Sequence, residues 1–153
     1  MKLIVGAEPF DTDDAQKLIA ALDAGLALSH QPHQMFGRNL RPEQLAPRLG
    51  IFLVARADGL AVGCGAIRRL DQTTVEVKRM FVEPGLRGQG IGRKILEHLE
   101  ENARALGAKR MVLETGVNQP EAIDLYTTAG FKPIECFGEY AGTSTSCCFE
   151  KRL

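Results

Sequence analysis

The chain has 153 residues, of which 44% are hydrophobic and 25% are charged, a composition typical of a globular protein. Nineteen basic and nineteen acidic residues give a formal net charge of zero, so nothing in the composition indicates a nucleic-acid or membrane-surface partner. The apolar runs are too short to span a membrane, and residues 1–5 are too few for a secretion signal. We therefore expect one cytoplasmic domain, residues 1–153, with no nucleic-acid and no membrane partner.

The four cysteines, Cys64, Cys136, Cys147 and Cys148, follow no zinc-site or Cys-x-x-Cys spacing. Three of them lie in apolar, strand-like surroundings, which favours small, buried and reduced thiols. A catalytic cysteine would need an electropositive and partly open site. The sequence therefore favours structural cysteines over a cysteine nucleophile.

The N-terminal third predicts a strand, a helix and a long irregular loop. Residues 2–6 form the strand. The helix that follows is capped by Asp11 or Thr12, and its apolar residues recur three or four positions apart. Its inner face consists of Ala15, Leu18, Ile19, Leu22 and Leu26. After the loop, Pro42 starts a short second helix that ends near Pro47.

The loop at residues 29–41 contains His33 and Phe36, side chains that can hydrogen-bond and stack. A long loop with such side chains can line a substrate site. Alternatively, it is a surface connection held in place by Met35 and Phe36, and the sequence leaves both interpretations open. On the first interpretation, His33, Phe36 and Tyr140 are candidate acceptor-binding residues.

Residues 51–57 and 61–68 predict two strands joined by the Asp-Gly pair at positions 58–59, a sequence typical of tight hairpin turns. Two glycines, Gly63 and Gly65, lie on one face of the second strand. Because neither has a side chain, we expect another element to pack closely there.

A third strand is predicted at residues 74–82. Side chains alternate between the two faces of a strand. Regular alternation therefore predicts that Glu76, Lys78, Met80 and Val82 share one face.

A glycine-rich turn separates this strand from a strongly periodic helix. Gly88, Gly90 and Gly92 leave the turn without Cβ atoms, so a ligand can approach bare backbone N–H groups at a helix N-terminus. Arg87 and Arg93 lie beside the same groups, where the helix dipole disfavours cations unless an anion is bound. The turn therefore predicts a polyphosphate site. The alternative is a flexible loop with solvated basic side chains.

The glycine spacing excludes two common phosphate loops. The dinucleotide fingerprint needs its third glycine three residues after the second, and a P-loop needs Gly-Lys followed by Ser or Thr. Glu114 does end a strand where a ribose-binding acid would lie in a dinucleotide fold. The chain nevertheless lacks the repeated strand–helix units of that fold, which we therefore disfavour.

The C-terminal half predicts two helices and three strands. The helix after the glycine turn runs to Gly107, and another opens at residues 118–121 and stops at Gly130. The strands are expected at residues 110–114, 131–137 and 145–152. This order of elements predicts a mixed sheet flanked by helices.

Three patterns within residues 51–153 resemble the GCN5-related N-acetyltransferase (GNAT) family and follow one another in the family's order. Residues 78–84, Lys-Arg-Met-Phe-Val-x-Pro, resemble the strand whose backbone pairs with the pantetheine arm of acetyl-CoA. Residues 87–92 resemble the Arg/Gln-x-x-Gly-x-Gly/Ala loop that holds its pyrophosphate. Residues 125–131, Leu-Tyr-x-x-x-Gly-Phe, are similar to the end of the family's acceptor-side helix.

The resemblance implies the acyl-CoA N-acyltransferase (GNAT) fold, an α/β (α+β) architecture. Its single central sheet is mixed and mostly antiparallel, with about four flanking helices. The resemblance also implies acetyl-CoA as co-substrate and no metal ion. The implied cofactor-binding residues are Met80, Phe81, Val82, Arg87, Gly88, Gln89, Gly90, Ile91, Gly92, Arg93, Asn118 and Gln119.

Two catalytic residues are implied by their positions. Tyr126 matches the tyrosine that protonates the departing coenzyme A thiolate. Glu76 lies eleven residues before Arg87, at the offset of the general-base glutamate in histone-acetylating members. An amine that attacks a thioester needs such an acid and base. Alternatively, Tyr126 is a core residue and Glu76 is held in an ion pair.

One position departs from the family's pattern, which often has Asn three residues before Ala at the start of this helix. Here Gln119 precedes Ala122 by three, and Asn118 comes one position earlier, so either amide is a candidate for the cofactor contact. The N-terminal third has no family motif, although this region usually decides the acceptor.

The resemblance therefore implies an enzyme of EC 2.3.1 type that acetylates a primary amine, of a small molecule, by direct attack in a ternary complex. One alternative is an enzyme that acetylates a protein N-terminus or lysine. Another is a non-catalytic acyl-CoA-binding module, which the intact Tyr126 disfavours. A homodimer is left open.

Overall fold

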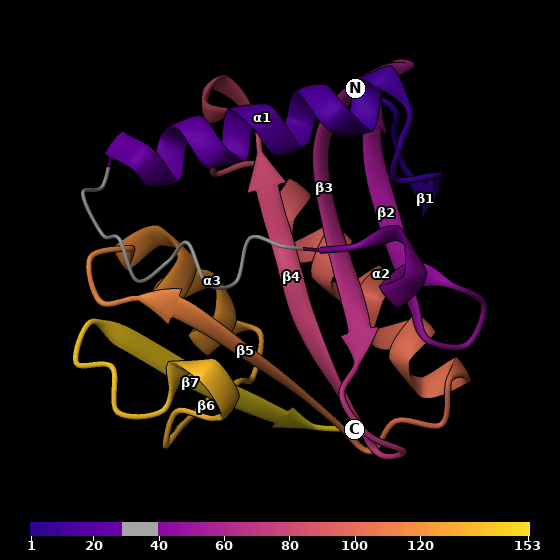
Figure 1. The fold of residues 1–153 in the computed structure, drawn as a ribbon. Coiled ribbons are helices and arrows are strands. Elements are labelled where there is room, and N and C mark those ends of the chain that lie inside the picture. Colours follow the sequence, from indigo (N-terminus) through magenta and orange to yellow (C-terminus); the bar gives the residue numbers. More distant parts are fainter. Residues whose placement is uncertain (29–39) are drawn as a thin grey trace.

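The computed structural model describes residues 1–28 and 40–153, whose seven strands form one sheet in the order β1-β2-β3-β4-β5-β7-β6 (Figure 1). Every neighbouring pair is antiparallel except β4 and β5, which are parallel. The strands are β1 (Leu3–Ala7), β2 (Gly50–Ala57), β3 (Leu60–Arg69), β4 (Thr74–Val82), β5 (Arg110–Gly116), β6 (Lys132–Ile134) and β7 (Ser146–Arg152). The predicted mixed, mostly antiparallel sheet is confirmed.

Three α-helices of the described residues cover the sheet: α1 (Asp13–Leu28), α2 (Ile91–Ala105) and α3 (Pro120–Thr128). Helix α1 lies across one face, while α2 and α3 belong to the core cluster on the other (Figure 1). The short helix predicted at Pro42 is a 3₁₀ turn, η2 (Pro42–Leu45), which makes three α-helices rather than about four. None of the described helices is both long and apolar enough to cross a membrane.

Most predicted boundaries are confirmed. Thr12 caps α1, because its hydroxyl accepts the backbone N–H of Ala15 at 3.1 Å. Gly107 and Gly130 follow α2 and α3 with φ of 81° and 96°, the left-handed conformation that commonly ends a helix. The strand predicted at residues 131–137 is shorter than expected, because β6 is an edge strand and Pro133 cannot donate to the ladder.

Helix α2 packs closely on β3 where the two glycines leave room. A Cβ atom on Gly65 would lie 2.6 Å from Met80 Sδ and 2.8 Å from Ile95 Cγ2. The buried residues of α2 are Ile91, Ile95, Leu96, Leu99 and Ala103. Burying each larger side chain contributes about 1.5–3 kcal/mol. The close packing predicted over Gly63 and Gly65 is confirmed, and α2 is the element that packs there.

Strand β4 contains a β-bulge. Its register on β3 shifts between Cys64 and Ala66, so Arg79 and Met80 both lie opposite Gly65. Arg79 has a φ of 59°, a left-handed conformation that is uncommon for a residue with a side chain.

The bulge reverses the alternation of the side chains on β4. Glu76 and Lys78 alternate along β4 with Val75 and Val77, which pack in the core cluster that contains the buried residues of α2 (the α2 cluster). The side chains of Glu76 and Lys78 therefore face the opposite side of the sheet. Beyond the bulge, Met80 and Val82 pack in the α2 cluster themselves. The prediction that these four residues share one face is therefore wrong. Side chains on a strand alternate every two residues, so the one extra residue in the bulge moves every later side chain to the other face.

Strands β4 and β5 pair only at their beginnings. Residues 74–76 of β4 lie beside residues 110–112 of β5, and the two strands then diverge (Figure 1). Among the described residues, no strand pairs with the rest of β4 on that side. The sheet is therefore split between β4 and β5 beyond their first three paired residues.

A disulfide joins Cys136 to Cys148, so the prediction of reduced thiols is wrong for this pair. The pairing of β6 with β7 brings together two cysteines whose sequence spacing carries no recognisable pattern. The disulfide closes a loop that contains the 3₁₀ turn η4 (Gly138–Tyr140). Cys64 and Cys147 are free, and burial raises the pKa of the Cys64 thiol to about 12, as expected of an unreactive buried thiol.

Candidate active site

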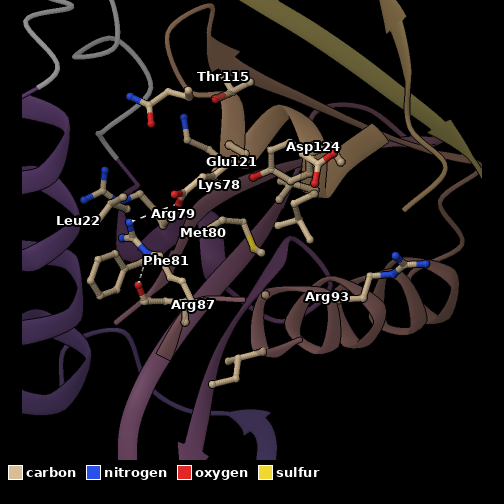
Figure 2. A pocket seen from close by; sticks show the side chains of 18 of the residues that line it. Leu22, Lys78, Arg79, Met80, Phe81, Arg87, Arg93, Thr115, Glu121 and Asp124 are labelled. Atoms are coloured by element: carbon tan, nitrogen blue, oxygen red, sulfur yellow. Dashed lines mark hydrogen bonds and ion pairs between the residues drawn. The ribbon is translucent and has the colours of Figure 1, made fainter. Parts of the chain in front are cut away.

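A cleft of about 840 Å³ opens where β4 and β5 separate. Its walls come from β4, β5, α3 and the glycine turn before α2, with α1 closing one side. Figure 2 shows Lys78, Arg79, Met80 and Phe81 along the β4 wall, with Arg87 at the opposite end of the row from Lys78. The cleft therefore connects the glycine turn to the polar residues near the middle of the sheet.

The β4 wall presents backbone groups to the cleft. Because β5 leaves β4 after Glu76, the β4 backbone from residue 77 to residue 82 has no strand partner on the cleft side among the described residues. Backbone N–H and C=O groups need hydrogen-bonding partners. An extended ligand that carries amide groups can supply them, as an added strand would.

The glycine turn leaves the N-terminus of α2 without a capping side chain. Gly88 and Gly90 have φ of 81° and 86°, in the left-handed region that favours glycine. The helix begins at Ile91 without a side-chain cap and without an acidic residue in its first turn. Its first N–H groups therefore lack intrahelical acceptors, and the helix dipole favours a negative charge beside them.

Arg87 holds this turn against the end of β4. Its Nε donates to the carbonyl oxygen of Val82 at 2.9 Å, and its guanidinium carbon lies 5.6 Å from the centre of the Phe81 ring. Its Nη1 also lies 3.8 Å from a carboxylate oxygen of Glu121 on α3. These side-chain contacts position the turn, and its residues Gly88 and Gly90 line the cleft.

Tyr126 of α3 lines the cleft from the side opposite β4. The residue is only 6% exposed, and its ring packs edge-on against Phe131 at 5.8 Å. Among the described residues, none forms a hydrogen bond with its hydroxyl group. Burial, and secondarily the negative charge of Glu114, raise the pKa of Tyr126 above its usual value. The hydroxyl therefore stays protonated near neutral pH and can donate its proton.

Glu76 lines the cleft from β4 and is 1% exposed. Arg68 donates to its Oε1 through Nε at 2.9 Å and Nη2 at 2.8 Å. Tyr140 donates its hydroxyl proton to Oε2 at 2.9 Å. Both carboxylate oxygens are therefore engaged, so the ion pair that is the alternative role of Glu76 is present within the cleft.

Lys78 and Arg79 are charged residues that line the cleft, although neither was predicted as a site residue from the sequence. Lys78 is 6% exposed, its Nζ lies 3.5 Å from the hydroxyl oxygen of Tyr140, and burial lowers its pKa. Arg79 donates through Nη2 to Asp23 of α1 at 2.8 Å, whereas its buried Nε has no hydrogen-bond partner. A sequence signal was lacking because the bulge decides where Arg79 points.

Most of the predicted site residues meet in this cleft. Those that line it are Glu76, Met80, Phe81, Val82, Arg87, Gly88, Gly90, Ile91, Gly92, Arg93, Gln119, Tyr126 and Tyr140. Gln89 and Asn118 do not line it, which favours Gln119 between the two candidate amides. The predicted residues His33 and Phe36 lie outside the described residues. Glu114 and Thr115 of β5 line the cleft without having been predicted as site residues.

The sequence of residues 19–131 matches the acetyltransferase (GNAT) family. The chain belongs to the GNAT family. It is 48% identical over 103 residues to the IAA acetyltransferase of Azospirillum brasilense, a match that covers 67% of each chain. A Klebsiella pneumoniae structure assigned to the acyl-CoA N-acyltransferases superposes with a TM-score of 0.84 at 34% identity, covering 99% of this chain and 97% of the other.

This GNAT chain is therefore an N-acetyltransferase, and the fold implied by the sequence resemblance is confirmed. The PaiA N-acetyltransferase of Thermoplasma acidophilum, solved with coenzyme A, has the same fold, with a TM-score of 0.77 at 16% identity over the whole of both chains. In the present chain, unpaired N–H groups at α2 suit a diphosphate, and the open edge of β4 suits the amides of a pantetheine arm.

Within residues 1–28 and 40–153, no group of three or more His, Cys, Asp or Glu side chains is placed to hold a metal ion. The metal-free reaction expected from the GNAT resemblance stays a prediction.

Proposed function

We propose that this GNAT enzyme transfers the acetyl group of acetyl-CoA to the primary amine of a small molecule while both substrates occupy the cleft. The observation that carries the proposal is the continuity of the cleft, which is lined by the N-terminus of α2, the open edge of β4 and Tyr126. A diphosphate at α2 and a pantetheine arm along β4 direct the thioester toward Tyr126. The acceptor then enters from the end that holds Glu76, Lys78 and Tyr140.

The chemistry requires an acid and a base. The acceptor ammonium loses a proton through a water molecule to Glu76, because both of that carboxylate's oxygens already accept hydrogen bonds. The amine nitrogen attacks the thioester carbon, and the C–S bond then breaks with its electron pair going to sulfur. Tyr126 gives its proton to the thiolate and regains one from the new amide nitrogen. Such proton transfer is worth roughly 10²–10⁴ in rate.

Two observations support a small acceptor. The relative from Azospirillum brasilense is named as an IAA acetyltransferase, and it shares 48% identity with this chain. In addition, buried side chains of Lys78 and Tyr140 surround the proposed acceptor end. Groups buried this deeply suit a compact molecule that enters the cleft.

The test begins with calorimetry of coenzyme A binding, followed by a thiol-release assay over a panel of small amines and peptides. We expect micromolar binding, release of thiol with small amines, and intersecting double-reciprocal lines when both substrates are varied. Mass spectrometry after incubation with acetyl-CoA alone should find no acetylated protein.

Three results would contradict the proposal. Coenzyme A binding without turnover on any amine would indicate a binding module. Turnover with peptides alone would indicate a protein acetyltransferase. Parallel lines together with an acetyl group on Cys64 or Cys147 would indicate a cysteine intermediate.

A further inference from the structure

Among the described residues, the acceptor end of the cleft contains a buried cation, Lys78, that no carboxylate contacts directly. Lys78 has three donor hydrogens, and its one hydrogen bond is the 3.5 Å contact with Tyr140 Oη. Among the described residues, no carboxylate oxygen lies within 4.0 Å of Lys78 Nζ, the longest distance of an ion pair. A buried ammonium without an ion-pair partner is unfavourable. The position therefore favours a ligand that brings the missing negative charge.

Glu76 and Glu139 act on the charge of Lys78 from a distance, and none of the described acids contacts its ammonium directly. Glu76, the next acid along β4, is bound by the Arg68 guanidinium and by the Tyr140 hydroxyl. Glu114, across the cleft on β5, accepts the hydroxyl of Ser146 at 2.7 Å. Glu76 and Glu114 are therefore already bound by other donors.

A second donor in the same wall has no partner. Arg79 follows Lys78 and lines the cleft, and its side chain is 3% exposed. Asp23 accepts from Nη2, but Nε, which has almost no exposed surface, has no hydrogen-bond partner among the described residues. Native proteins satisfy most buried donors, so an unsatisfied one at a binding cleft points to a ligand acceptor.

We propose that the acceptor amine carries an anionic group, a carboxylate or a phosphate, and that Lys78 binds it with Arg79 Nε beside it. This inference rests on the proposed function, since it specifies the substrate of the same cleft. Lys78 and Met80 line the same cleft, on either side of the bulge at Arg79. A small molecule that carries both an amine and an anion, as an amino acid does, can occupy a cleft that both residues line. Lys78 is thus a specificity-determining residue.

The test compares matched acceptors that differ in the anionic group. Amino acids are compared with their methyl esters and with the corresponding decarboxylated amines, and phosphoethanolamine is compared with ethanolamine. The wild-type enzyme should favour the anionic member of a pair by roughly 10–100-fold in kcat/KM, the size of a charge-assisted hydrogen bond. The favoured pair distinguishes a carboxylate from a phosphate acceptor.

Variants at Lys78 assign the preference to its charge. Lys78→Met should raise the KM of the anionic acceptors by roughly 10–100-fold relative to that of their neutral counterparts and leave the KM of acetyl-CoA nearly unchanged. Lys78→Arg should retain the preference. Lys132→Met, which removes one exposed lysine on β6, is the matched control and should change neither.

A wild-type preference for neutral amines would overturn the inference. An equal loss of kcat on both members of each pair in Lys78→Met would also overturn it, because it would assign Lys78 to proton transfer or to folding. In either case the enzyme still acetylates amines. Failure of the proposed function gives a different result, the absence of thiol release with every amine.

Discussion

The two ends of the cleft are built from different parts of the chain. The end assigned to coenzyme A consists mainly of backbone groups, at the glycine turn before α2 and along the open edge of β4. The acceptor end consists of charged and polar side chains, with Glu76, Lys78 and Tyr140 linked by hydrogen bonds. Binding at the coenzyme A end should therefore be sensitive to Cβ atoms added at the glycines. The acceptor end should be sensitive to the identity of each side chain, which suits it to decide specificity.

The largest effect is expected at Tyr126, where the two ends meet. Tyr126→Phe keeps the ring and its contact with Phe131 but removes the proton donor. We expect kcat to fall by roughly 10²–10⁴ while the Kd of coenzyme A stays unchanged. The pKa of Tyr126 is raised above its ordinary value of 10. Deprotonation of Tyr126 should therefore not lower the wild-type rate at any pH up to about 10. Full activity of the variant would remove Tyr126 from the mechanism.

A second variant tests whether Glu76 belongs to catalysis or only to the structure of the acceptor end. Glu76→Gln should reduce the rate most at low pH, where the acceptor amine is protonated and needs the base. Arg68→Met is the matched control, since it breaks the same ion pair but retains the carboxylate. pH–rate profiles of both variants decide the question. Equal losses at every pH in the two variants would assign Glu76 to a structural ion pair.

A smaller effect is expected from the disulfide between Cys136 and Cys148, which closes the loop that carries Tyr140. With a sequence separation of 12, the cross-link should stabilise the fold by about 2–4 kcal/mol. Urea unfolding of Cys136→Ala, with the free-cysteine variant Cys147→Ala as control, measures this difference. Reduction should also raise the acceptor KM without changing coenzyme A affinity. Unchanged stability after reduction would contradict a structural role for the disulfide.

The sequence predicted the two ends unequally, for a physical reason. The coenzyme A end depends on local chemistry, because Gly88 and Gly90 are adjacent to the helix whose N-terminus they expose. The acceptor end depends on a contact between distant segments, Tyr140 with Glu76, and the β4 wall beyond it depends on a bulge at Arg79 that appears only when β4 is paired with β3. Alternation therefore placed Met80 on the wrong face. Pairing of distant strands likewise decided which cysteines meet.

The most direct test of the account is whether coenzyme A binds at the glycine turn. Gly90 and Gly107 have φ of 86° and 81°, and a Cβ on either would meet nothing within 4 Å. Replacement of either by valine should therefore cost similar backbone strain, of order 1–2 kcal/mol. Only Gly90→Val places a side chain where the diphosphate would lie. Calorimetry should show coenzyme A binding weakened at least about tenfold in Gly90→Val, a loss of about 1.4 kcal/mol, and unchanged in Gly107→Val. Equal coenzyme A affinity in the two folded variants would contradict the account.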